Sequence, residues 1–370
     1  MMKIDLQIER IISEIKRGQK VVVYDSISQI SVLLSAAELV HNTTLNEHIS
    51  MGLSFPNIIL SSQRCNALGI KTNKNCSFLI DGNWSRDELL AIALDQKNKS
   101  NFKIEGLIEE NSKIVDSCLE LLKQSKLLPT GIMTLLADVN FNQIVEWSNE
   151  NNLISLNVND LLSSDPQKFD DLQIVAKAHL PIQQTNECDI IVFRSDDSVN
   201  EYFCLLIGKA REKFKNSDDF VPIVRMHSQC ITGDILNSLK CDCGDQLKSS
   251  LDFMVQKKQG ILIYLSQEGR NIGLTNKLRA YKLQEEGLDT VDANLTLGFS
   301  EDERNYGIAS KILKKLNVKT VRLITNNPVK IQELERMKIK VLERIAISTK
   351  VNPFNKSYLN TKRVKTGHYI

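Results

Sequence analysis

The chain has 370 residues, of which 42% are hydrophobic and 25% are charged, with 16 Gly and 7 Pro. This composition excludes fibrous and mainly disordered proteins, and a chain of this length is expected to form two domains that each bury a core. Lys and Arg exceed Asp and Glu by only two, 47 against 45, so the charge balance predicts neither nucleic acid nor an anionic membrane as a partner. A small anionic ligand is still compatible with it.

Residues 1–20 alternate charged and apolar side chains at helical spacing and lack the continuous apolar stretch of a signal peptide. No run of about 18 apolar residues occurs in the sequence. We therefore expect a cytoplasmic protein. In that reducing compartment isolated cysteines are expected to be ordinary core or surface residues, and these are Cys65, Cys76, Cys118, Cys188 and Cys204.

The N-terminal half alternates predicted helices and strands. An isoleucine stripe at helical spacing between residues 8 and 15 predicts an amphipathic helix that ends at Gly18, and the apolar run 21–24 predicts a buried strand. Further helices are predicted over 89–94, 114–122 and 141–147, and short strands over 78–80 and 153–156.

The segment 163–184 contains Ser-Ser-Asp-Pro and a second proline, Pro181, and is predicted to be a linker. We therefore expect a first domain over 1–164, a linker over 165–185 and a second domain over 186–370.

The C-terminal half repeats the alternation of helix and strand. Strands are predicted over 189–193, 202–207, 223–226, 261–265, 321–324 and 341–347. Helical stripes are formed by Leu247, Leu251, Met254 and Val255, expected to end at Gly260, and by Ile308, Ile312, Leu313 and Leu316. The fold class predicted is α/β, with two domains that are each a mixed sheet packed with helices.

Three cysteines are clustered rather than isolated. Ten residues separate Cys230 from the pair Cys241 and Cys243, and three thiolates are suitable ligands for zinc. A catalytic zinc site leaves its fourth position to water, whereas a structural site closes it with a fourth ligand, for which His227 is a candidate. The spacing alone leaves both kinds of site open.

Two loops that follow predicted strands carry polar residues suited to ligand binding. Residues 267–273 contain two glycines, Glu268 for hydrogen bonding and Arg270 for pairing with phosphate, although such a segment is commonly an ordinary turn. Residues 325–330 end in Lys330 at the start of a helix, where an anion would be favoured, although a solvated lysine is the ordinary alternative. Asp302 and Arg304 alone would indicate a surface ion pair.

Six motifs, in this order, resemble the GTP cyclohydrolase II family from about residue 190 to the C-terminal Gly-His. They are R-M-H-S-Q-C-I-T-G-D, C-D-C-G-D-Q-L, Q-E-G-R-N-I-G-L, L-R-A-Y, D-A-N-x-x-L-G-F-x-x-D-E-R and T-N-N-P-V-K. The resemblance implies zinc-dependent hydrolysis of GTP to 2,5-diamino-6-ribosylamino-4(3H)-pyrimidinone 5′-phosphate, formate and pyrophosphate, the first step of riboflavin biosynthesis.

The resemblance also implies residue roles. Cys230, Cys241 and Cys243 would hold one Zn²⁺, which activates the water that attacks C8 of guanine. Tyr281 would stand beside the reacting ring, Asp302 would accept a proton, and Arg304 would be the nucleophile toward the α-phosphate or stabilise its transition state. GTP contacts, with Mg²⁺ on the phosphates, would be Arg225, Met226, His227, Ser228, Gln229, Gln246, Glu268, Gly269, Arg270, Thr290, Thr325 and Lys330.

Gln229 departs from the family pattern, which usually has Glu before the first zinc cysteine. The replacement removes a negative charge near the metal and leaves every zinc ligand in place. The family also implies a homodimer.

Residues 4–163 resemble a degenerate 3,4-dihydroxy-2-butanone 4-phosphate synthase domain, which precedes the cyclohydrolase in many family members. In the acidic stretch of that synthase, both glutamates and the last aspartate are replaced here by Ser28, Ile30 and Val32. Its Gly-His-Thr-Glu-Ala motif reads Glu-Glu-Asn-Ser-Lys at 109–113, and a late Glu reads Leu135. Its threonine-rich phosphate loop, expected after residue 81, is missing. Without oxygen ligands magnesium would not be held, so no synthase activity is expected.

The alternative is a bifunctional enzyme that also makes 3,4-dihydroxy-2-butanone 4-phosphate from ribulose 5-phosphate, which the lost acidic residues disfavour. A regulatory or structural nucleotide-binding protein with a non-catalytic zinc is disfavoured by the intact Tyr281, Asp302 and Arg304.

Overall fold

The computed structural model describes residues 2–41, 43–52, 55–80, 84–94, 113–136, 141–163, 172–195, 201–213 and 220–369, without the side chains of 2–5. Two expectations about the first domain fall outside the described residues. They are the replaced motif, of which residues 109–112 are not described, and the missing phosphate loop, expected where residues 81–83 are not described. None of the described helices combines the length and the apolar character that a bilayer crossing requires.

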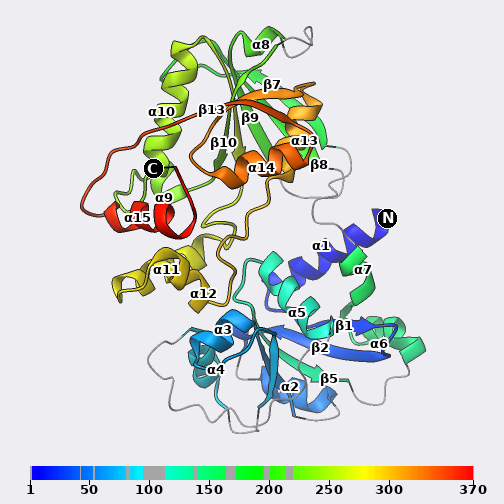
Figure 1. Cartoon of the computed structure of the whole chain (residues 1–370). Helices are drawn as coiled ribbons and strands as arrows, with labels where there is room; N and C mark the ends of the chain where they lie inside the picture. The colour runs from blue at the N-terminus through cyan, green and yellow to red at the C-terminus, as the bar shows by residue number, and fades with distance from the viewer. Residues whose placement is uncertain are drawn as a thin grey trace. The chain divides into compact units, whose positions relative to one another are not determined.

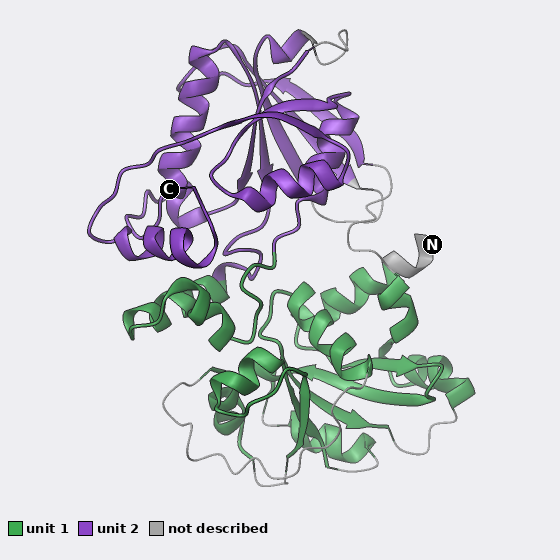
Figure 2. Ribbon diagram, viewed as in Figure 1, with its two compact units in different colours: residues 1–165, 275–303 green, residues 166–274, 304–370 purple. Residues whose placement is uncertain are grey.

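The chain divides into two compact units (Figure 2). Unit 1 comprises residues 1–165 and 275–303, and unit 2 comprises residues 166–274 and 304–370. The chain therefore passes from unit 2 into unit 1 after Leu274 and returns at Arg304. Each unit has its own sheet and its own core, as expected for two domains.

Unit 1 contains a six-stranded mixed sheet in the order β4-β3-β5-β2-β1-β6 (Figure 1). All neighbours are antiparallel except β1 and β6, which are parallel. The strands are β1 (Val21–Asp25), β2 (Ile30–Ala36), β3 (Asn57–Leu60), β4 (Cys76–Leu79), β5 (Thr130–Leu135) and β6 (Ile154–Asn157).

Amphipathic helices cover this sheet. The isoleucine stripe of α1 (Met2–Lys16) is buried in the core, and Gly18 follows the helix with φ +76, a conformation that favours glycine. The other helices of residues 1–165 are η1 (Ala37–Leu39), α2 (Thr44–Met51), α3 (Ser62–Ala67), α4 (Arg86–Leu94), α5 (Lys113–Gln124), η2 (Phe141–Gln143), α6 (Ile144–Glu150) and α7 (Val158–Ser163). Unit 1 also includes α11 (Leu274–Glu285), apart from its first residue, and α12 (Thr290–Thr296).

Unit 2 contains a seven-stranded mixed sheet in the order β13-β12-β10-β11-β9-β8-β7. The four strands from β13 to β11 are parallel, and the remaining neighbours are antiparallel. The strands are β7 (Leu172–His179), β8 (Cys188–Ser195), β9 (Glu201–Gly208), β10 (Ile223–Ser228), β11 (Gln259–Leu265), β12 (Thr320–Ile324) and β13 (Lys340–Ile345). The prediction of an α/β fold with two mixed sheets is confirmed.

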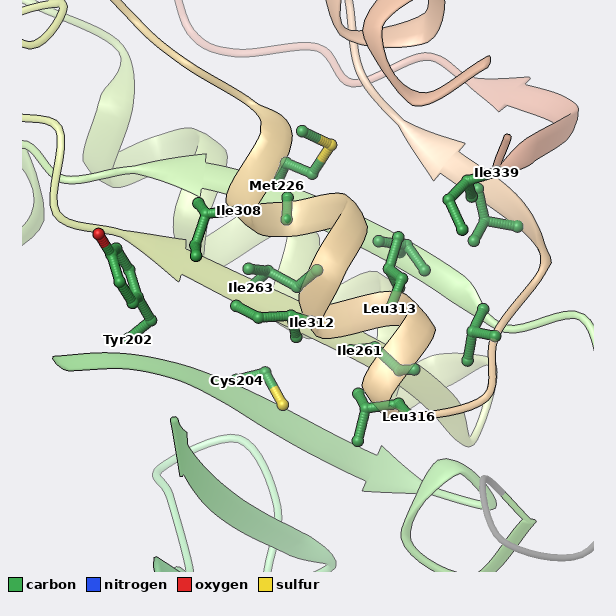
Figure 3. Packing of buried hydrophobic residues seen from close by; sticks show 14 of the residues in the cluster. Tyr202, Cys204, Met226, Ile261, Ile263, Ile308, Ile312, Leu313, Leu316 and Ile339 are labelled. Carbon is green, nitrogen blue, oxygen red and sulfur yellow. The ribbon is translucent and has the colours of Figure 1, made fainter. Parts of the chain in front are cut away.

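Helices on both faces bury the parallel strands of unit 2. Figure 3 shows α13 (Gly307–Lys315) crossing the sheet, with Ile308, Ile312 and Leu313 directed into a cluster that includes Met226 and Ile263. A second cluster lies under α10 (Cys243–Gln256). The remaining helices are α8 (Ala210–Lys213), α9 (Ile231–Asp234), α14 (Pro328–Arg336) and α15 (Lys356–Lys365).

The structure differs from the sequence analysis in the expected linker. Strand β7 lies within 165–185 and pairs with β8 along its whole length. It is an edge strand whose side chains are nearly all exposed. Its sequence therefore lacks the buried apolar run of a central strand, and the two prolines that flank it led to the prediction of a linker.

Gly260 also has a different role from the one expected. Helix α10 ends at Gln256, and Gly260 lies inside β11, where a Cβ atom would collide with Met254 of that helix. The glycine therefore allows close packing of helix and strand rather than ending the helix.

We expect Ile312→Ala to lower the free energy of unfolding of unit 2 by about 2–5 kcal/mol, because it leaves a cavity in a fully buried cluster. Lys314→Ala, on the exposed face of the same helix, should change it by less than about 0.5 kcal/mol. Urea denaturation followed by far-ultraviolet circular dichroism measures both variants. Both tryptophans, Trp84 and Trp147, lie in unit 1, so their fluorescence reports the unfolding of that unit. If Ile312→Ala shifts the fluorescence transition as much as the circular dichroism transition, the two cores are not separate.

Candidate functional site

The predicted ligand residues of unit 2 gather at one edge of its sheet. Strands β12, β10 and β11 are adjacent and parallel, so their carboxyl ends lie together. The segment 225–230 ends β10, the loop 266–273 follows β11, and residues 325–330 follow β12. In α/β sheets this edge is where ligands bind.

Cys230, Cys241 and Cys243 meet at this edge. Their sulfur atoms lie within 4.8 Å of one another, and Cys230 Sγ is 3.7 Å from Cys241 Sγ. Cys230 is the N-cap of α9, Cys243 is the first residue of α10, and Cys241 lies just before the N-cap of that helix. The prediction of a three-thiol cluster is confirmed, and His227, the candidate fourth ligand, is not part of it.

Two glycines allow the two cysteine segments to pack closely. A Cβ atom at Gly233 would lie 2.9 Å from Cys241 Sγ and 3.0 Å from Cys230 Sγ, and one at Gly244 would collide with the Gly233 carbonyl. The Gly233 N–H also donates to Cys230 Sγ at 3.3 Å, which favours the thiolate form. The compact soft-donor set fits a zinc ion.

The Cys241 and Cys243 thiols are protonated in the absence of a cation. Hydrogen bonding to Cys230, together with burial, raises the pKa of Cys241 to about 11. Hydrogen bonds with Cys230 and Cys241, together with burial, raise the pKa of Cys243 well above its usual value. Thiolates crowded in a buried site repel one another, so a cation is needed to stabilise them together.

Asp234 ties the end of β10 to α9. Its carboxylate accepts from the backbone N–H of Cys230 at 3.0 Å and from the Tyr264 hydroxyl at 2.8 Å, and lies 3.0 Å from His227 Nε2. Burial lowers the pKa of His227 despite this carboxylate, so the ring is neutral. Because a carboxylate only accepts, the proton is on Nε2 and Nδ1 is a buried hydrogen-bond acceptor.

Asp242, between the last two cysteines, is a second buried carboxylate. Burial favours its neutral form, but the Lys362 ammonium at 2.7 Å and the Gln246 amide outweigh this effect and lower the pKa of Asp242. Lys362 lies on α15, so this ion pair attaches the C-terminal helix to the cysteine loop. Gln246 in turn accepts from Arg225.

The loop after β11 has an unusual backbone. Gly269, Arg270, Asn271 and Gly273 all have φ between +59 and +88, a conformation that is costly for the two residues that are not glycine. Glu268 closes the loop onto α9, because its carboxylate accepts from Ile231 N at 2.6 Å and from Gly269 N at 3.0 Å. Glu268 is therefore engaged by backbone donors at the cysteine site.

Several buried polar atoms at this edge have no hydrogen-bond partner. They are Arg225 Nε, His227 Nδ1, Ser228 Oγ and Gln267 Oε1. Leaving such a group without a partner costs about 1–3 kcal/mol, so a concentration of them indicates a site where a ligand supplies the partners.

Buried cations accompany these atoms. Burial lowers the pKa of Arg225, whose guanidinium donates to the Ile324 carbonyl at 3.2 Å and to Gln246. Lys330 donates to the Met226 carbonyl at 2.7 Å, and its Nζ lies 5.4 Å from the centre of the Tyr306 ring. Arg304 stacks on the same ring at 5.7 Å. Thr325 caps the turn that leads to α14 by accepting from Asn327 N.

Three of the predicted site residues lie in unit 1. Tyr281 is on α11, Thr290 begins α12, and Asp302 is exposed in the segment that precedes the return to unit 2. The other predicted contacts lie in unit 2, and they include Met226, Gln229 and Gly269. The backbone N–H of Gln229 donates to the Leu265 carbonyl at 2.8 Å.

Sequence reasoning did not select Asp234, Asp242 or Lys362. The two aspartates stand inside the quoted cysteine motifs, so their position next to metal ligands was an available signal. Lys362 lies more than a hundred residues from its partner, and nothing local in the sequence indicates that pairing.

The fold and the cluster define an α/β protein with three cysteines placed so that they could hold a metal ion. The family model described as GTP cyclohydrolase II matches residues 172–346. GTP cyclohydrolase-2 of Haemophilus influenzae (strain PittGG) is 44% identical over 199 residues, which cover 54% of this chain and 89% of that protein. The chain therefore belongs to the GTP cyclohydrolase II family, a family of hydrolases in riboflavin biosynthesis, and the resemblance of its C-terminal half is confirmed.

Two further comparisons cover more of the chain. GTP cyclohydrolase-2 of Azospirillum brasilense is 38% identical over 253 residues, 68% of this chain and 64% of that protein. A solved two-domain 3,4-dihydroxy-2-butanone 4-phosphate synthase, RibBX from A. baumannii, is 13% identical with a TM-score of 0.37, covering 93% of this chain and 99% of that one. That TM-score is too low to equate the folds.

We expect metal-free protein to bind zinc and to release roughly two or more protons per zinc at pH 7, because Cys241 and Cys243 are protonated before binding. Calorimetric titration in two buffers of different ionisation enthalpy measures the number released. Cys241→Ser should bind zinc at least about tenfold more weakly, whereas Cys118→Ser, buried in unit 1, should bind it normally. Equal zinc affinity in the Cys241→Ser variant would contradict the site.

Lys362→Met should destabilise unit 2 by about 3 kcal/mol, because it leaves the Asp242 carboxylate buried without its cation. It should also weaken zinc binding, since Asp242 orients the two cysteines beside it. Arg363→Met, an exposed neighbour on the same helix, is the control for stability and zinc affinity. If both variants behave alike, the ion pair does not hold α15 to the cysteine loop.

Proposed function

We propose that this chain is a zinc-dependent GTP cyclohydrolase II, which converts GTP into 2,5-diamino-6-ribosylamino-4(3H)-pyrimidinone 5′-phosphate, formate and pyrophosphate. The observation that carries the proposal is the meeting of three thiols with buried, unpartnered polar atoms and buried cations at one edge of the sheet. This reaction requires a set of metal ligands, hydrogen-bonding groups for the base and positive charge for the phosphates.

When bound by the three thiolates, zinc supplies a Lewis acid that lowers the pKa of a coordinated water toward 7. The protein residues keep that centre fixed. Asp234 and Asp242 fix the backbone around the cysteines, and Glu268 anchors the neighbouring loop to α9. Such fixed dipoles need no rearrangement during the reaction.

His227 is suited to recognise the base. Its neutral ring presents Nδ1 as a buried acceptor, which can take a hydrogen bond from a guanine N–H. Ser228 Oγ and Gln267 Oε1 lack partners beside it and can contribute further contacts. Gln229 supplies a neutral amide where the family usually has a carboxylate, which reduces the negative charge near the metal.

Arg225 and Lys330 are suited to the triphosphate. Both are buried, and a cation in a water-poor site attracts phosphate more strongly than one in bulk water. The other proposed contacts in unit 2 are Met226, Gln246, Glu268, Gly269, Arg270 and Thr325, with Mg²⁺ on the phosphate oxygens.

Four residues are assigned roles through the family resemblance. Asp302 is proposed as the proton acceptor and Tyr281 as the phenol beside the reacting imidazole, and Thr290 as a GTP contact. Arg304 is proposed to act at the α-phosphate. A guanidinium is protonated at ordinary pH, so we assign Arg304 the electrostatic stabilisation of the phosphoryl transition state as readily as nucleophilic attack.

Unit 1 is proposed to lack synthase activity. Val32, which replaces an acidic residue of the synthase pattern, lies in the hydrophobic core of the unit, where no metal ligand can be supplied. Asp25 is engaged by Ile27 N and the Ser28 hydroxyl. We also propose a homodimer and a cytoplasmic location, both from the family resemblance.

Zinc-loaded protein incubated with GTP and magnesium should release formate, and the same protein with ribulose 5-phosphate should release none. Asp302→Asn should lower kcat for GTP by about a hundredfold or more, since it removes the proton acceptor. Formate from the pentose would establish the bifunctional alternative. No formate from GTP would overturn the proposed function in favour of a nucleotide-binding protein.

A further inference from the structure

Residues 275–303 carry three of the proposed site residues and pack within unit 1 (Figure 2). Helix α12 lies against α3, which belongs to the N-terminal part of that unit (Figure 1). The segment is therefore supported by a domain that the proposed reaction does not otherwise use. Its contacts are concentrated at three places.

Arg64 of α3 makes the central contact. Its side chain is fully buried, and its guanidinium donates to the Ile92 carbonyl at 2.7 Å and to the Thr296 carbonyl at 2.8 Å. Both carbonyls lie in the last turn of a helix, α4 for Ile92 and α12 for Thr296. Carbonyls at helix ends lack partners within the helix and carry partial negative charge, so one guanidinium caps two helices at once.

Ser61 and Gly298 make the adjoining contact. The buried Ser61 hydroxyl donates to the Gly298 carbonyl at 2.7 Å and accepts from Arg64 N, which caps α3. Gly298 has φ +90 and ends α12, and a Cβ there would lie 2.7 Å from Ser61 Oγ and 2.9 Å from Pro129. A glycine is thus required by both the backbone conformation and the contact.

Three further contacts bracket the segment. At its start, Asn276 donates to the Lys126 carbonyl at 3.0 Å, and Arg279 pairs at 2.6 Å with Glu38, whose side chain is 6% exposed. At its end, Glu303 pairs with Lys123 at 3.2 Å. Tyr281 lies two residues after Arg279, and Asp302 lies between Gly298 and Glu303.

We propose that residues 1–165 hold the segment 275–303 in its working conformation, with Ser61 and Arg64 as positioning residues for the cyclohydrolase reaction. This inference rests on the proposed function, because it uses the roles of Tyr281, Thr290 and Asp302. It gives the N-terminal domain a task that needs no synthase chemistry. The five residues from Gly298 to Asp302 are too few to absorb a displacement of the end of α12, so a shift there moves the proton acceptor.

The test compares kcat, KM for GTP and the pH profile of kcat in full-length, zinc-loaded protein carrying Ser61→Ala, Arg64→Met or Arg64→Lys. We expect kcat to fall about tenfold or more in Ser61→Ala and Arg64→Met, with KM changed less than about threefold and partial recovery in Arg64→Lys. A smaller folded fraction would scale the pH profile without moving it, whereas a displaced Asp302 changes its shape.

Two control variants remove comparable bonds inside unit 1 away from the segment. Gln7→Ala removes a donor to the Ser155 carbonyl, and Ser148→Ala removes a donor to the Ile144 carbonyl. Wild-type activity in Ser61→Ala and Arg64→Met, or an equal loss in the controls, overturns the inference while leaving the proposed function intact. Absence of formate from the wild type overturns both.

Should Arg64→Met not fold, Ser61→Ala decides the question by hydrogen exchange as well as kinetics. We expect faster exchange of the amides of 290–303 in Ser61→Ala and unchanged exchange in Ser148→Ala. Unchanged exchange of these amides together with unchanged kcat overturns the inference.

Discussion

The parallel pairing of β10 with β11 and β12 is the constraint on which the candidate site depends. These strands are almost wholly buried, and most of their side chains are apolar, whereas the polar residues Arg225, His227 and Ser228 lie in β10. Parallel register places the three following segments at one edge. Three segments that are far apart in the sequence therefore lie close together, namely the cysteine loop, the segment 266–273 and the turn before α14.

Two buried carboxylates then hold these segments in a fixed arrangement. Asp234 and Asp242 flank the cysteines, and each accepts several hydrogen bonds from different elements, which include β11 in one case and the C-terminal helix in the other. A buried carboxylate with this many partners has few alternative arrangements. The atoms that stay without partners, such as His227 Nδ1, are then held ready for a ligand.

Local patterns in the sequence predicted most of the described strands and the three-thiol cluster, because apolar periodicity and motif spacing act over short ranges. They did not predict β7, since an exposed edge strand has almost no apolar signature. They also did not predict that 275–303 joins unit 1 rather than a continuous domain over 186–370. That division depends on Arg64 and Ser61, which lie over two hundred residues away and form no motif with the segment.

The central claim, that the cysteine centre opens the guanine ring at C8, is tested most directly by a single turnover of zinc-loaded enzyme with GTP labelled with carbon-13 at C8. Nuclear magnetic resonance follows the label. We expect the label to leave the nucleotide and appear in formate, and we expect zinc-free enzyme to leave the label in the purine ring. Label retained in the ring by zinc-loaded enzyme, or formate released equally without zinc, would contradict the account.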